Sequence, residues 1–284
     1  MSRYGIAEWY GQDFLTLTPK ERQRLASIAL GEQDSVPHCP FRPITCNKRG
    51  GVCSLRSYIE DNGEISTFEG PPVIVCPNRF EQDTMLVQWL GEIVGFRPQD
   101  LQLAREVPFM QSVVTQRPAG KIDLILAADQ HELKWFGLEI QAVYFSGDRM
   151  SKEFIALQKS DRNRPPYPLG KRRPDWRSSS AKRLMPQLQV KGPTLRRWHS
   201  KIAVAVDMPF FDSMGGPSAN PSHDLDDGDV IWLIPELRDG KLIRRHWEVL
   251  TLEASCEKLL AAKPVSRREF EQVLRKKLQF MKST

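Results

Sequence analysis

The fold expected of this chain follows from residues 119–147, whose sequence is AGKIDLILAADQHELKWFGLEIQAVYFSG. Apolar and β-branched residues fill Ile122 to Ala127 and Trp135 to Phe145, which predicts two β-strands joined by a polar connection. Each strand carries one carboxylate, Asp123 or Glu139, where the pattern expects a core residue. A buried ionised carboxylate is costly unless a cation accompanies it, so the two positions predict either a metal site or salt bridges.

The oxygen atoms around these carboxylates suit a divalent metal. Side chains alternate along a strand, so Glu139 and Gln141 are expected on one face, and the Ile140 carbonyl can complete an oxygen cage with Asp123. Mg²⁺ prefers such hard oxygen ligands with few carboxylates. The alternative is that Asp123 and Glu139 are strand-edge carboxylates in ordinary salt bridges.

The spacing of these residues resembles the PD-(D/E)xK nuclease core, in which a proline and an aspartate precede an (Asp/Glu)-x-Lys triplet. Two departures are visible here: no proline stands directly before Asp123, and Gln141 occupies the lysine position. A glutamine amide can hold a water but cannot take its proton, so the metal would have to lower the pKa of that water.

The remaining patterns predict an α/β protein with a mixed β-sheet flanked by helices. Residues 105–110 read as the strand before the Asp123 strand, so Glu106 either reaches the metal cage or lies on the surface. Residues 201–211 predict a central strand, and residues 230–235 with 243–250 predict a hairpin. Capping boxes predict a first helix from Thr18 and a last helix from Ser266, the latter with an inward apolar side formed by Phe270, Val273, Leu274 and Leu278.

Four of the five cysteines lie within 38 residues: Cys39, Cys46, Cys53 and Cys76. In a cytosolic protein such crowding favours a metal over disulfides, and Gly50-Gly51 favours a turn that lets thiolates converge. Four thiolates complete a tetrahedral shell, which predicts a structural zinc or iron site. The gaps are wider than in the usual CxxC pairs, so scattered buried cysteines remain the alternative.

A basic segment follows the Glu139 strand and is rich in Arg, Lys, Pro and Ser over residues 161–183, DRNRPPYPLGKRRPDWRSSSAKR. It suits contacts to DNA phosphates, or it is a basic loop without a partner. A helix capped by the serines at 178–180 continues the segment, and further basic residues are interleaved with the cysteines. The candidate DNA contacts are Arg49, Arg172, Arg173, Arg177, Lys182, Arg183 and Gln187.

Composition sets the outer limits. The chain has 284 residues, enough for one large or two small domains, and 41 Lys+Arg against 35 Asp+Glu give a net charge of +6, consistent with a polyanionic partner. It has neither an apolar run long enough to span a bilayer nor the N-terminal pattern of a signal peptide. We therefore expect a cytoplasmic protein without a membrane partner.

Taken together, these residues resemble the family of the restriction endonuclease NotI. The resemblance covers Cys39 to Phe211 and rests on the tetracysteine segment ending in Cys76-Pro77, the helix after it, Glu106, Asp123 and the triplet Glu139-Ile140-Gln141. It implies a type II restriction endonuclease that cleaves double-stranded DNA with Mg²⁺ at a GC-rich palindromic site. It further implies a homodimer, an iron-bearing tetracysteine module and a companion DNA methyltransferase.

The same resemblance assigns the roles of the candidate residues. The four clustered cysteines would be metal ligands; Asp123, Glu139 and Gln141 would form the catalytic set, with Glu106 as a further candidate. We expect an N-terminal helix and tetracysteine metal-binding module over residues 1–78, and a restriction-endonuclease-like catalytic domain over residues 79–284. Two other functions remain in view: a defence nuclease without a fixed site, and a non-catalytic DNA-binding protein that keeps only the metal module.

Overall fold

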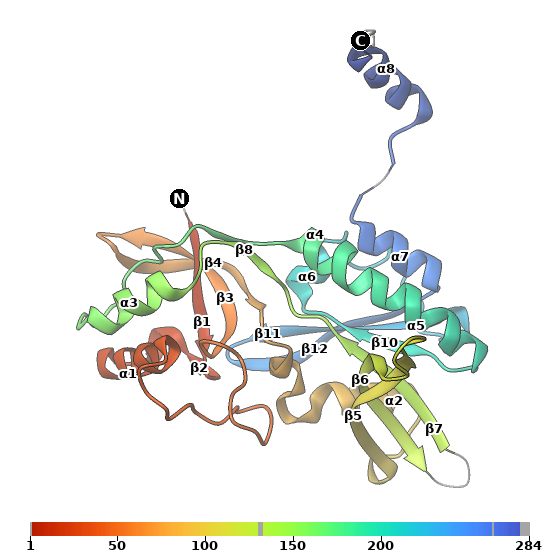
Figure 1. The fold of residues 1–284 in the computed structure, drawn as a ribbon, viewed down its shortest axis with the longest axis horizontal. Coiled ribbons are helices and arrows are strands. Elements are labelled where there is room, and N and C mark those ends of the chain that lie inside the picture. Colours follow the sequence, from red (N-terminus) through yellow and green to blue (C-terminus); the bar gives the residue numbers. More distant parts are fainter. Residues whose placement is uncertain (1, 130–132, 263, 279–284) are drawn as a thin grey trace.

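The computed structural model describes residues 2–129, 133–262 and 264–278. The largest sheet formed by these residues has six strands in the order β12-β11-β10-β7-β6-β5 (Figure 1). Strands β5, β6 and β7 form an antiparallel meander, β10 runs parallel to both β7 and β11, and β12 pairs antiparallel with β11. The sheet is therefore mixed, as the sequence predicts. Its strands are β5 (Leu101–Gln111), β6 (Pro118–Asp129), β7 (Leu133–Ile140), β10 (Ile202–Ala205), β11 (Val230–Arg238) and β12 (Lys241–Leu250).

Helices cover both faces of this sheet because its central strands are apolar on both sides. Helices α5 (Met185–Arg197) and α7 (Leu252–Leu260) lie on one face, where Leu188 and Leu259 pack with Val204 and Trp232. Helix α2 (Met85–Ile93) lies on the other face, where Leu90 and Trp89 pack with Ala205, Ile231 and Leu233. Neighbouring residues of one strand thus enter different cores, as the period-two alternation of a strand requires.

A second sheet, of order β2-β1-β3-β4, is built mainly from the N-terminal residues. Helix α1 (Pro19–Leu30) begins at Thr18 with the predicted capping box and packs beside α3 (Ser151–Lys159). The core of this sheet joins Trp9, Leu25 and Tyr58 to Phe154 and Leu157 of α3. Its strands are β1 (Arg3–Trp9), β2 (Gln12–Asp13), β3 (Val52–Asp61) and β4 (Glu64–Ile74).

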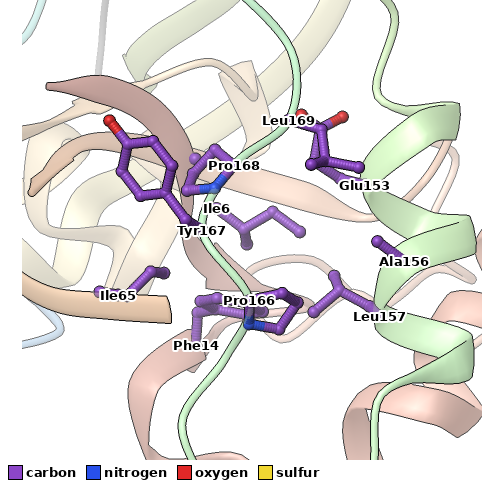
Figure 2. Close-up of a pocket in the computed structure, with 11 residues that line it drawn as sticks. Ile6, Phe14, Ile65, Glu153, Ala156, Leu157, Pro166, Tyr167, Pro168 and Leu169 are labelled. Carbon is purple, nitrogen blue, oxygen red and sulfur yellow. The ribbon is translucent and has the colours of Figure 1, made fainter. Parts of the chain in front are cut away.

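A small apolar pocket marks where the chain after α3 crosses the N-terminal sheet. Figure 2 shows Pro166, Tyr167 and Pro168 running between β1 and α3 over Ile6 and Leu157. The pocket belongs to the packing that joins α3 and its following loop to this sheet. Residues beyond 150 therefore contribute to the same core as residues 1–78.

Shorter elements complete the fold. Strands β8 (Phe145–Gly147) and β9 (Arg172–Pro174) form a two-stranded ribbon, and α4 (Trp176–Ser179) leads through a π-helical turn (Ser180–Leu184) into α5. Helix α6 (Met208–Asp212) follows β10. Short 3₁₀ helices lie at Phe14–Thr16, Pro77–Thr84, Pro98–Asp100 and Leu225–Asp227. No helix in the described ranges is long and apolar enough to cross a membrane.

Two sequence expectations about strands need correction. The strand predicted over residues 135–145 ends at Ile140, because the chain leaves the sheet there and starts a new pairing at Phe145. The strand predicted over residues 201–211 ends at Ala205, and Asp207 caps α6 by accepting the N–H of Phe210. Of the polar connection predicted between β6 and β7, residues 130–132 lie outside the described part of the chain.

The last helix, α8 (Arg267–Lys277), does form from its predicted capping box at Ser266. Its apolar side, however, is not a core element, because Phe270 and Val273 are more than half exposed and Leu274 is 42 % exposed. Figure 1 shows α8 standing away from the rest of the molecule. The inward orientation expected from its pattern is therefore wrong.

Candidate active site

The two carboxylates singled out by the sequence meet where β6 and β7 separate. The pairing of these strands ends at Leu124 and Leu138, so Asp123 and Glu139 are the first residues beyond the ladder. The freed N–H of Ile140 donates to Oδ2 of Asp123 at 2.9 Å, which ties the two strand ends together. The topology therefore brings Asp123, Glu139 and Ile140 to one place.

Glu139 is a deeply buried carboxylate. Its side chain is 1 % exposed, and burial followed by the nearby Asp123 charge raises its pKa to about 7, against the opposing effect of Lys191. Oε1 accepts from Lys191, whereas the buried Oε2 has no hydrogen-bond partner among the described residues. A buried acceptor of this kind costs free energy unless a ligand satisfies it.

Lys191 reaches this site from α5. Its Nζ lies 2.6 Å from Oε1 of Glu139 and 3.3 Å from Oε1 of Gln187, one helical turn earlier. The Lys191 side chain is only 8 % exposed. Gln187, expected to contact DNA, thus holds a lysine of the carboxylate site.

Glu106 stands opposite Asp123 on the neighbouring strand. Pairing of β5 with β6 joins Arg105 to Leu124 and Val107 to Ile122, which leaves Glu106 across from Asp123, with a positive φ of 51°. Its side chain is 69 % exposed and pairs with Lys121 at 3.1 Å. Glu106 lines the same cleft as Asp123 without joining its hydrogen bonds in this structure.

Gln141 follows the end of β7 and lines a broad groove. Its backbone N–H donates to the Ala205 carbonyl, continuing the pairing with β10, and its side-chain amide donates to the Ala142 carbonyl at 2.6 Å. The groove is lined by Gln141, Tyr144 and several basic residues: Lys48, Arg49, Arg149, Arg172 and Arg183. Ile140 and Pro77 line both this groove and the cleft that holds Asp123, so the two hollows adjoin.

The predicted DNA contacts fall into two groups. Arg49, Arg173, Arg177, Lys182 and Arg183 are exposed, and the Arg183 guanidinium stacks 4.7 Å from the centre of the Tyr144 ring. Arg172 is buried, and its guanidinium forms an ion pair with Glu153. Because that charge is already matched inside the protein, Arg172 is better explained as a structural residue than as a phosphate contact.

All four clustered cysteines are free thiols, and they lie near one another. Burial raises the pKa of Cys76 above the usual range, and the neighbouring Cys46 and Cys39 add to the effect; burial and Cys76 do the same for Cys53. Gly50 and Gly51 have positive φ in the turn between Cys46 and Cys53, and Cys46 is near enough to add to the raised pKa of Cys53. Within the described ranges, no three His, Cys, Asp or Glu side chains are arranged to hold a metal ion.

Sequence reasoning missed Lys191 and Arg149. The signal for Lys191 was present: Leu184, Leu188 and Leu195 form the buried stripe of this helix, and Lys191 occupies the stripe position between the last two. A lysine in an apolar stripe requires a buried partner. Arg149 gave no such signal, because only the tertiary structure places it on the groove.

The sequence of the chain matches a known protein family. The sequence model of the family described as restriction endonuclease NotI matches residues 23–247, a span that includes both carboxylates, the clustered cysteines and the basic segment. No curated protein matches the chain. Since the match covers most of the 284 residues, the chain belongs to the NotI restriction endonuclease family.

Proposed function

We propose that this protein is a type II restriction endonuclease that hydrolyses phosphodiester bonds of double-stranded DNA with Mg²⁺ at a fixed, GC-rich palindromic site. Family membership gives the broader class, a DNA-cleaving hydrolase. The observation that carries the finer proposal is the pair Asp123 and Glu139 at the split between β6 and β7, beside a groove lined with basic residues. In our proposal this pair belongs to a PD-(D/E)xK core made of α2, β5, β6, β7, α5 and β10.

The residues present fit a divalent metal. Oε2 of Glu139 is buried without a hydrogen-bond partner in the described structure, and Asp123 is close enough to raise the pKa of Glu139. A cation held by Asp123, Glu139 and the Ile140 carbonyl would bind the unpartnered Oε2. It would also offset the effect of the Asp123 charge on the pKa of Glu139. Two carboxylates and a carbonyl are the sparse oxygen set that Mg²⁺ accepts.

The protein residues divide the work of hydrolysis. Bound Mg²⁺ would supply a water of lowered pKa and neutralise charge that develops on the phosphate. Asp123 and Glu139 hold the site, and the Gln141 amide orients the water by hydrogen bonding, since an amide takes no proton. Glu106 serves as an outer carboxylate on the same cleft and reaches the site only if it leaves its pairing with Lys121 when DNA binds.

The groove beside Gln141 would hold the DNA backbone. Arg49, Arg149 and Arg183 line it, and Arg173, Arg177 and Lys182 are exposed on the segment that follows α3. Contacts of Lys and Arg to phosphate supply affinity that falls steeply with salt. This arrangement would deliver a phosphodiester to Asp123 and Glu139.

We further propose that Cys39, Cys46, Cys53 and Cys76 bind one structural iron or zinc ion. The support is chemical: the four thiols are free and close enough to affect one another's pKa, with Cys53 at the start of β3, and thiolates are soft ligands suited to these metals. Arg49 and Arg42 lie in the same loop region, so an ordered module would also fix part of the basic surface.

The proposal includes two partners, a second copy of the chain and a DNA methyltransferase. A palindromic target is matched by a two-fold symmetric homodimer, because each half-site then meets one carboxylate site. A companion methyltransferase would protect the host's own copies of the site. Sedimentation of the purified protein tests for the homodimer. Comparing the cleavage of methylated and unmethylated DNA tests for protection by a methyltransferase.

The deciding experiment is a digest of unmethylated phage DNA with Mg²⁺, followed by sequencing of the fragment ends. Discrete bands with a shared end sequence support the proposal, and Glu139→Ala serves as the inactive control. A smear would instead indicate a defence nuclease without a fixed site. Binding without any metal-dependent cutting would indicate a non-catalytic DNA-binding protein.

A further inference from the structure

The carboxylate site contains a positive charge that its sequence motif lacks. Gln141 occupies the position where an (Asp/Glu)-x-Lys triplet carries lysine, and its neutral amide is bonded to the Ala142 carbonyl. Lys191 lies within 2.6 Å of Oε1 of Glu139 and comes from a different element, α5. The ammonium group is therefore present at the site although the motif does not provide it.

This ion pair is difficult to explain as a device for stability alone. The side chains of Lys191 and Glu139 are 8 % and 1 % exposed, so both lose most of their hydration. Apolar residues of similar volume often stabilise a protein at least as well as a buried ion pair. Lys191 lies in the stripe formed by Leu184, Leu188 and Leu195, where a leucine or methionine would pack without that cost.

Two hydrogen bonds orient the ammonium group of Lys191. Gln187, one turn earlier on α5, accepts a second hydrogen bond from Nζ at 3.3 Å. Lys191 occupies only Oε1 of Glu139 and leaves Oε2 without a partner among the described residues. Helix α5 leads directly to β10, which pairs with β7 at Glu139, so the helix and the strand that carry the two residues are tied together.

We propose that Lys191 is a positioning residue of the nuclease: it holds Glu139 by one oxygen and brings from α5 the positive charge that Gln141 does not carry. The inference rests on the proposed nuclease function and names a residue for its reaction. Because Lys191 is buried, it acts through Glu139 and not through direct contact with DNA. Its loss should therefore lower kcat and leave KM nearly unchanged.

The test compares Lys191→Met with a matched control, Lys258→Met. Lys258 forms another buried pair, 3.6 Å from Glu248, with side-chain exposures of 12 % and 0 %. Both substitutions remove the ammonium group that pairs with a buried glutamate. Both therefore report the loss of stability that follows from breaking such a pair. We expect Lys191→Met to lower kcat on plasmid DNA by about 100-fold, as the loss of one fixed polar group in an active site does, while Lys258→Met keeps its kcat.

Two further variants separate charge from shape. Lys191→Arg keeps the charge at the same place and should retain part of the activity. Adding Gln141→Lys to Lys191→Met places an ammonium at the usual motif position. The double variant should have a kcat at least about tenfold higher than that of Lys191→Met. If neither variant exceeds Lys191→Met, the charge of Lys191 is not its contribution and the proposal fails.

A measurement without metal or DNA tests the ion pair itself. A double-mutant cycle of urea unfolding with Lys191→Met and Glu139→Gln should show that the two changes are not additive. Additive effects, an unchanged kcat in Lys191→Met, or equal kcat losses in Lys191→Met and Lys258→Met would each overturn the proposal. A parent protein that does not cut DNA would instead refute the proposed function, and the cycle would still report on the pair.

Discussion

The buried carboxylate of Asp207 should make the stability of this protein depend on pH in an unusual direction. Asp207 is 1 % exposed and lies after β10, where it accepts the N–H groups of Ile74 and Phe210. Burial raises its pKa from 3.8 to about 7, although these hydrogen bonds oppose the shift. The folded state therefore keeps a proton on Asp207 over a pH range where the unfolded chain has lost it.

The sign of the effect follows from proton linkage. Between pH 4 and 7 the folded protein binds more protons at Asp207 than the unfolded chain does, so this group's contribution falls as pH rises. Each pKa unit corresponds to about 1.4 kcal/mol, and about two units lie between pH 5 and 7. Asp207→Asn cannot titrate. The free energy of unfolding of the parent should therefore fall, relative to the variant, by about 3 kcal/mol between pH 5 and 8.

Urea unfolding of both proteins at pH 5, 6, 7 and 8, without divalent metal, measures this difference. Glu139 and every other titrating group are common to both proteins, so their contributions cancel. Asn at 207 can still accept the Ile74 N–H through its side-chain oxygen, which preserves the end of β10. A difference between parent and variant that stays constant from pH 5 to 8 would refute the assignment of a raised pKa to Asp207.

Other variants test the proposed active site and metal module. Asp123→Ala and Glu139→Ala should abolish cleavage while gel-shift affinity for DNA survives, because affinity comes from Lys and Arg contacts to phosphate; cutting at the parent rate by either would remove the assignment. Gln141→Ala should slow turnover about 100-fold through loss of an oriented water, whereas Gln141→Lys should retain some activity, and an alanine variant at full rate would contradict the role of Gln141. Elemental analysis should find one iron or zinc per chain in the parent and in Cys256→Ser, since Cys256 lies on α7, away from the cluster. That metal should be lost on replacing any of Cys39, Cys46, Cys53 or Cys76, and equal metal in all five Cys→Ser proteins would contradict the module.

The sequence by itself determined the elements whose residues interact locally. The capping boxes at Thr18 and Ser266 depend on residues three positions apart, and both helices begin where the sequence predicts. The runs of apolar and β-branched residues located β6 and the start of β7, and with them Asp123 and Glu139. These signals depend on local composition and on short-range hydrogen bonds, so no distant contact was needed to find them.

Only the tertiary structure decided where strands end and which charges meet. Strand β6 separates from β7 after Leu138, and β7 continues only to Ile140, where its pairing with β10 ends; no local feature of residues 135–145 encodes that split. The pairing of Glu139 with Lys191, 52 positions later, depends on α5 crossing the sheet. Helix α8 shows that a local pattern can also mislead. Its apolar pattern is that of a core helix, yet Phe270 is 58 % exposed. An amphipathic pattern specifies which side of a helix is apolar, whereas the fold decides whether anything covers it.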